Sequence, residues 1–217
     1  MTSRSDADGL IEDLVTDLRP VRRLAPPWLR AAGWLLVVLA AAAVLSRFGD
    51  LHALVRRLAA EIDMQMALAG STVTAVLATL AAFQLSLPDR SRAWALLPLP
   101  TAALWLGSSG MGCLDMWLQP GMAIGTISGA ADDCMMLVVG ISLPLSILLF
   151  LMLRRARPLR PGLVAGMGGL AAAAAAASLL WIVHPFETAA SAVAVHVVAV
   201  LIVIGLARVA GSRALGG

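Results

Sequence analysis

Residues 112–134, GCLDMWLQPGMAIGTISGAADDC, interrupt a chain that is otherwise composed of long apolar runs. The segment holds both cysteines of the protein, Cys113 and Cys134, and it contains no Lys or Arg. Small residues in its middle disfavour a continuous helix, namely Gly125, Ser128 and Gly129. Because a loop without positive charge is expected on the outer face of a membrane, we predict an aqueous outer loop over residues 108–134.

The composition of the whole chain places this loop in an integral membrane protein. Of 217 residues, 60% are hydrophobic and 13% are charged, and the mean hydropathy is +0.89. These values lie far on the apolar side of an average soluble domain. The formal net charge is +3, but the arginines are dispersed beside membrane segments, so we expect contact with membrane lipid and no direct nucleic-acid binding.

Outward from the loop, the apolar runs predict an all-α fold with six transmembrane helices. The expected spans cover about residues 29–45, 64–87, 93–107, 135–153, 162–183 and 188–207. Residues 46–63 alternate charged and apolar side chains and predict an interfacial amphipathic helix. Pro98 and Pro100 are expected to distort the third span, and Pro144 to kink the fourth. Gly162 and Gly166 begin the fifth span at a spacing that allows close helix packing.

The distribution of arginine predicts the orientation of these spans. An even number of spans places both termini on the same side of the membrane. The N-terminal arm, the second and fourth loops and the tail share that side, and together they hold 13 of the 16 arginines. The positive-inside rule therefore predicts that both termini are cytoplasmic.

Residues 1–27 form the one sizeable soluble segment, which precedes the transmembrane domain at residues 28–217. Asp6 and Asp8 are candidate N-caps of a short helix that Pro20 would end. Its apolar stripe has helical spacing and consists of Leu10, Ile11, Leu14, Val15 and Leu18. A helix of about three turns is marginal alone in water, so the stripe needs a surface to cover it.

Two surfaces are open to this stripe. It could lie on the membrane or on the helix bundle, or it could bind a partner protein. The other face of the helix is acidic, with Glu12, Asp13 and Asp17, whereas helices that bind anionic lipid are typically basic. The acidic face therefore favours a partner-binding arm.

The two cysteines allow a structural or a sensing role. A disulfide between Cys113 and Cys134 would close a loop of about 22 residues and stabilise the fold by about 3 kcal/mol. Alternatively, the pair responds to an oxidant or binds a transient heavy-metal ion, with His184 or Asp133 as further ligands, since thiolate and imidazole groups suit such metals.

No grouping of residues predicts an enzyme, and we expect no catalytic residues and no resident cofactor. His196, expected near the middle of the sixth span, is interpreted as a neutral histidine bonded between helices. A small transporter or metal-efflux protein would need a polar route through the spans. A membrane thiol oxidoreductase would need a second redox pair. Both stay open as alternatives.

The arm and the cysteine loop together resemble a known family. The arm LIEDLVTDLRPVRRLAPPWLR is followed by one cysteine in GCLDMW and a second cysteine 21 residues further on. This layout resembles the NrsF family, bacterial inner-membrane anti-sigma factors for extracytoplasmic-function sigma factors. The resemblance implies that the arm, including Leu14, Pro20 and Val21, captures a sigma factor. It also implies that Cys113 and Cys134 sense metal or oxidative stress and thereby release it.

Overall fold

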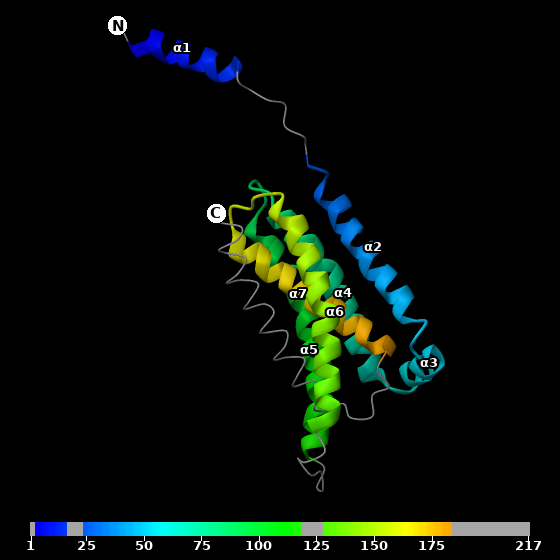
Figure 1. Ribbon diagram of the computed structural model, residues 1–217. Coiled ribbons are helices and arrows are strands. Elements are labelled where there is room, and N and C mark those ends of the chain that lie inside the picture. The colour runs from blue at the N-terminus through cyan, green and yellow to red at the C-terminus, as the bar shows by residue number, and fades with distance from the viewer. Residues whose placement is uncertain (1–2, 17–23, 119–127, 184–217) are drawn as a thin grey trace.

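A computed structural model describes residues 3–16, 24–118 and 128–183, and it places side chains at 9, 11–16, 24–108 and 140–183. All regular secondary structure in these ranges is helical, which confirms the all-α prediction (Figure 1). The elements in chain order are α1 (Ser3–Thr16), α2 (Pro27–Leu45), α3 (Leu51–Ala60), α4 (Ile62–Leu85), the 3-10 helix η1 (Arg92–Leu96), α5 (Leu99–Leu118), α6 (Ser128–Arg154) and α7 (Pro161–Val183).

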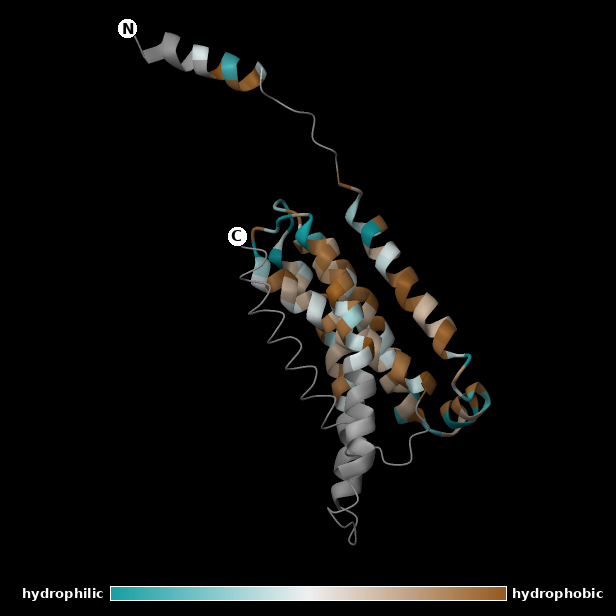
Figure 2. Cartoon of the chain, viewed as in Figure 1, coloured by the Kyte–Doolittle hydropathy of each residue, from teal (hydrophilic) through white to brown (hydrophobic). Residues whose placement is uncertain are grey.

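Three of the described helices, α2, α4 and α7, are long and apolar enough to cross a membrane. Gly140–Arg154, the second half of α6, is a shorter apolar stretch. Apolar residues cover these helices, and hydrophilic ones gather at their ends (Figure 2). The count of six spans stays a prediction, and the expected sixth span at residues 188–207 lies outside the described residues.

The core forms around α7, which packs against α4 on one side and α6 on the other (Figure 1). Its alanine run, residues 171–177, is buried throughout. Such small side chains let neighbouring helix backbones approach closely. At Gly168 of α7, an added Cβ would lie 3.2 Å from Leu153 Cδ1. Nothing lies within 4 Å of a Cβ at Gly162, so this member of the predicted glycine pair makes no close contact.

The predicted start of the third span is wrong. A helix was expected from about residue 93, but the chain forms the short η1, turns at Pro98 and begins α5 only at Leu99. Proline lacks the N–H that a helix interior needs, whereas Pro100 in the first turn of α5 loses no helical hydrogen bond. The helix is established when Ala102 N–H donates to Pro98 O at 2.9 Å.

The predicted extent of the cysteine loop is also wrong. α5 continues to Leu118 and α6 already begins at Ser128, so Cys113 and Cys134 lie in helices and not in a loop over residues 108–134. Pro120 in the sequence offers a physical reason for a helix end at Leu118, because a proline disfavours the helical conformation just before it. α5 therefore extends to Leu118, well past the predicted start of the loop at residue 108.

The two amphipathic helices form close to where they are expected. α3 lies inside the predicted interfacial segment, and its N-cap Asp50 accepts a hydrogen bond from Ala53 N–H at 3.0 Å. α1 begins at Ser3, earlier than the candidate caps Asp6 and Asp8 suggested. Its predicted end at Pro20 lies outside the described residues.

Candidate functional site: the arm and its anchor in the bundle

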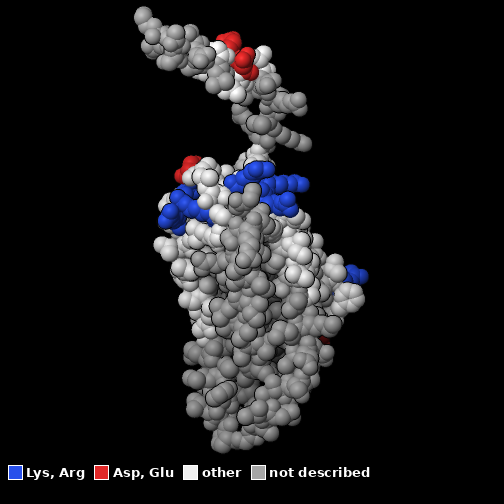
Figure 3. All heavy atoms as spheres, turned by 60° about the vertical axis from the view of Figure 1, so that its left-hand side comes forward, with Lys and Arg blue, Asp and Glu red and all other residues white. Residues whose placement is uncertain are grey.

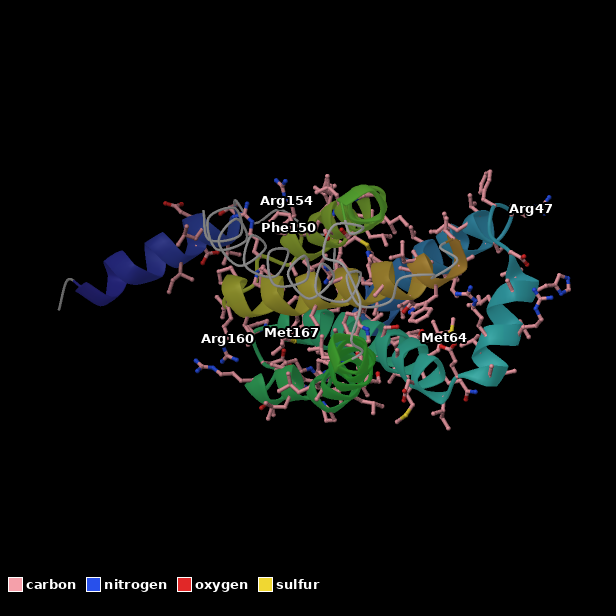
Figure 4. The ribbon with its side chains drawn as sticks, turned by 90° about the horizontal axis from the view of Figure 1, so that it is seen from below. Arg47, Met64, Phe150, Arg154, Arg160 and Met167 are labelled. Atoms are coloured by element: carbon pink, nitrogen blue, oxygen red, sulfur yellow. The ribbon has the colours of Figure 1, made fainter. Side chains whose placement is uncertain are left out.

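The bundle has one strongly basic end. The starts of α2, α5 and α7 and the ends of α4 and α6 meet there, and arginine side chains cover it beside the arm (Figure 3). The described arginines of this end are Arg90, Arg92, Arg154, Arg155, Arg157 and Arg160. Arg154 and Arg160 lie far from Arg47, which follows α2 at the opposite end (Figure 4). The basic end of the bundle and the end that carries Arg47 therefore lie on opposite sides in this view.

The arm helix α1 lies apart from the bundle and presents its apolar stripe to solvent (Figure 1). Ile11, Leu14 and Val15 are 57%, 61% and 57% exposed. Glu12 and Asp13 are exposed as well. Contiguous exposed apolar residues on a short helix are typical of a surface that binds another molecule. Leu10 lies in α1 without a described side chain, and the other predicted binding residues, Leu18, Pro20 and Val21, lie outside the described residues.

The arm enters the bundle through a proline elbow. Pro26 occupies the N-cap position of α2 with φ −50° and ψ 145°, and Pro27 opens the helix. Both residues have a restricted φ, so the direction in which the chain leaves α2 is narrowly defined. The position of α2 therefore determines where the arm emerges.

Arg30 anchors the first turn of α2 in the bundle. Its guanidinium Nη2 donates a hydrogen bond to Met152 O, in the last turn of α6, and its Cζ lies 4.8 Å from the centroid of the Phe83 ring on α4. The side chain is 9% exposed. Hydrogen bonds from charged groups contribute about 1.5–3 kcal/mol, and a desolvated cation–π contact contributes about 2 kcal/mol. These contacts offset the cost of burying the cation.

Trp34 lies one turn further along the same face of α2 and is fully buried. Its indole Nε1–H donates to Leu145 O of α6 at 3.2 Å. Residues i and i+4 share a helix face, so Arg30 and Trp34 both contact α6. The buried residues of α2 are these two side chains and Ala31 between them. We call Arg30, Trp34 and their acceptors Met152 and Leu145 the α2–α6 clasp.

This clasp was not predicted from the sequence. An arginine this close to the start of a predicted span is expected at the membrane surface, but Arg30 lies inside the bundle. The signal that identifies it is the combination of a cation within an apolar span-length helix and a tryptophan four residues later on the same face. An ionisable residue inside such a helix normally has a partner and a role.

Helix direction places both cysteine positions away from the basic end. Cys113 lies 14 residues along α5 from its start at the basic end, and Cys134 lies 20 residues before the end of α6. At 1.5 Å per residue these separations are roughly 21 and 30 Å. The backbone there is helical, and the two side chains lie outside the described ones. Asp133 likewise has a helical backbone and a side chain outside the described ones. His184 and His196 lie wholly outside the described residues.

Within the described residues no three or more His, Cys, Asp or Glu side chains gather as a metal site. The features that are present define a helical membrane protein with an exposed amphipathic arm, joined by a proline elbow to an apolar bundle.

Comparison with protein families agrees with this architecture. The profile of the NrsF family, described as negative regulator of sigma F, matches residues 14–216, from within the arm almost to the C-terminus. The chain belongs to the NrsF family, and its partner is a sigma factor. Searches of curated proteins and of solved structures found no match to the chain.

Proposed function

We propose that the protein is an anti-sigma factor that holds a sigma factor of the extracytoplasmic-function class with its N-terminal arm at the cytoplasmic face of the bacterial inner membrane. The observation that carries this proposal is the exposed stripe of Ile11, Leu14 and Val15 beside the acidic Glu12 and Asp13. Sigma factors bind DNA through basic surfaces, and an acidic amphipathic helix is complementary to such a surface in both charge and shape.

The orientation follows from the basic end of the bundle. The arm emerges at the end that carries the described arginines of the second and fourth loops, and the positive-inside rule assigns this end to the cytoplasm. The family match supports a sigma-factor partner, which is cytoplasmic. A small transporter, a metal-efflux protein or a thiol oxidoreductase would not need an exposed arm on this side.

The decisive residue of the stripe for this proposal is Leu14. Leu14→Asp places a charge in the centre of the apolar stripe, and we expect the amount of sigma factor recovered with the full-length tagged chain to fall at least about tenfold, the size typical of an interface hot spot. Recovery is measured by quantitative mass spectrometry of the detergent-solubilised complex.

The matched control for this substitution is Thr16→Asp. Thr16 is also exposed on α1, but two residues along a helix point to opposite faces. This variant is expected to retain the sigma factor. Equal recovery with Leu14→Asp and with the parent chain would contradict the proposed role of the arm.

We further propose that Cys113 and Cys134 sense metal or oxidative stress and that their response releases the sigma factor. Both positions lie near helix ends remote from the basic end, where a periplasmic signal would arrive. Metal–thiolate ligation is strong enough to shift a two-state equilibrium by the roughly 5.5 kcal/mol that near-complete release requires.

Replacing both cysteines by serine tests the sensing role. The double variant Cys113→Ser, Cys134→Ser is expected to hold the sigma factor as the parent does but to keep it after addition of cadmium ions or of the thiol oxidant diamide. The control is His196→Ala, which should release it normally. Normal release from the double variant would show that the cysteines are not the sensor.

A further inference from the structure

We infer that Arg30 and Trp34 are positioning residues that make the root of the arm follow movements of α6. This inference rests on the proposed function, because it states how a change at the cysteine end of α6 reaches the partner-binding arm. It concerns residues that lie in neither the arm nor the cysteine segment.

The first support is how α2 is held. The buried residues of α2 are Arg30, Ala31 and Trp34, and the rest of the helix is partly buried or exposed, with Leu36 and Leu39 64% and 63% exposed. Arg30 and Trp34 both donate to backbone carbonyls of α6. A main-chain carbonyl cannot rotate away as a side chain can, so these bonds attach the first turns of α2 directly to the backbone of α6.

The second support is where the clasp grips α6. Pro144 lies inside the helix, directly before Leu145. A proline there removes one backbone hydrogen bond and creates a flexible point, because its ring also clashes with the preceding turn. Leu145 and Met152, the two acceptors, both lie on the C-terminal side of this point. The clasp therefore holds the segment of α6 that can move when the helix bends at Pro144.

The third support is unused hydrogen-bonding capacity beside the clasp. Gln84 Oε1 and Ser146 Oγ are buried and have no partner in the described part of the chain. Gln84 follows Phe83, which lies under Arg30, and Ser146 follows Leu145, which accepts from Trp34. Leaving a buried polar atom without a hydrogen bond costs free energy. In a second arrangement of α6 against α2 and α4, Gln84 and Ser146 could form the hydrogen bonds that they lack here.

These observations connect the two ends of the molecule through one helix. α6 carries Cys134 in its second turn and is bonded to the root of the arm at its other end. A displacement at the start of α6 is passed along the helix, is redirected at Pro144 and moves α2 through Arg30 and Trp34. The proline elbow then transfers the movement of α2 to the arm.

The test uses the full chain in lipid nanodiscs, with Cys113→Ser and Cys134→Ser so that spin labels can be placed at Trp28→Cys on α2 and Val73→Cys on α4. Both label positions are exposed, at 59% and 43%. Pro144→Ala is the perturbation of α6. With the clasp intact, we expect it to shift the distance between the labels by about 1–2 Å, the size of a typical helix displacement. With Arg30→Met and Trp34→Phe, the shift should be absent.

The matched control is Trp105→Phe, the same substitution at another buried tryptophan, which lies in α5 and packs against Gly70 of α4. This variant should retain the full shift in label distance. If the clasp only stabilised the fold, Arg30→Met and Trp34→Phe would lower thermal stability but would not remove the shift. The inference is overturned if Pro144→Ala moves the labels equally with and without the clasp, or if it leaves them unmoved when the clasp is intact.

Affinity for the sigma factor recovered with the full chain separates this inference from the proposed function. If both hold, Pro144→Ala changes that affinity at least about threefold with the clasp intact and not when it is broken, as a double-mutant cycle measures. A label shift without any sigma-factor binding would leave the clasp standing and refute the proposed role of the arm.

Discussion

Helices α2 and α7 are both apolar and both long enough to cross a membrane, yet most residues of α7 are buried, whereas the buried residues of α2 are Arg30, Ala31 and Trp34. The difference lies in side-chain size. α7 consists largely of alanine and glycine, which let α4 and α6 approach its backbone. α2 points leucine and valine outward. Hydropathy thus decides that a helix enters a membrane, and side-chain size decides whether it becomes core or periphery.

This difference also separates two kinds of attachment. α7 is held by continuous close packing, in which no single side chain dominates. α2 is held by Arg30 and Trp34 near its start and by partly buried apolar side chains further along, namely Leu35, Val38, Ala41, Ala42 and Leu45. Elements with few buried contacts open and shift at lower cost than the core does. The arm is therefore attached to the helix of the two that is better suited to move.

Enlarging one alanine in α7 and one in α2 tests this difference with the largest expected effect. Ala174 of α7 is fully buried, and Ala174→Leu should destabilise the protein by about 3 kcal/mol, the upper part of the range for overpacking a filled core. The same change at the exposed Ala43 of α2 should be neutral. Thermal unfolding in detergent, followed by size-exclusion chromatography, measures both. Equal tolerance at the two positions would mean that α7 is not the core.

Replacing a glycine by alanine in the packed core and in α2 should change the free energy of unfolding in opposite directions. An added Cβ at Gly70 of α4 would lie 3.0 Å from Trp105 Cβ and 3.1 Å from its backbone, whereas nothing lies within 4 Å at Gly33 of α2. Gly70→Ala should destabilise by about 1–2 kcal/mol, because the backbone of α5 cannot yield cheaply. Gly33→Ala should stabilise by about 0.5–1 kcal/mol, since alanine favours helix. The same thermal unfolding assay decides, and two shifts of the same sign would refute the packing difference.

The sequence was sufficient for the helices whose hydropathy is uniform. α2, α4 and α7 begin and end within two residues of the predicted spans, because a long apolar run has only one way to satisfy its backbone in a membrane. The predicted helix boundaries were wrong where prolines and glycines interrupt the apolar runs. α5 begins after Pro98 and not at residue 93, and the glycines around residue 125 led to a predicted loop that overlaps the end of α5 and the start of α6.

The arm stripe could also be predicted, but the clasp could not. Ile11, Leu14 and Val15 share a face by helical periodicity alone, and all three are exposed. Arg30 lies near a membrane boundary, where snorkelling to the surface is the default expectation for arginine. Its burial depends on Phe83 and on a carbonyl of α6, which are 53 and 122 residues away in sequence. Contacts at such separations follow from the packing of the bundle and not from local pattern.

The smallest expected effect lies at the far end of α2, where Asp50 caps α3. The Ala53 N–H donates to the Asp50 carboxylate, and this hydrogen bond holds the pKa of the carboxyl below its ordinary value, assisted by the nearby Arg56. The charged form is thus favoured by the folded helix. The contribution of the cap to α3 is complete above the ordinary pKa of aspartate and is lost as the pH falls through the lowered value.

A spin label at the exposed Val55, in the chain without cysteines, should gain mobility over that acidic range. Asp50→Asn keeps an acceptor at the N-cap but does not titrate, so its label mobility should not respond to this titration. An identical acid response in both variants would show that α3 loosens for another reason, and α1 and the clasp should be unaffected by the change in either case.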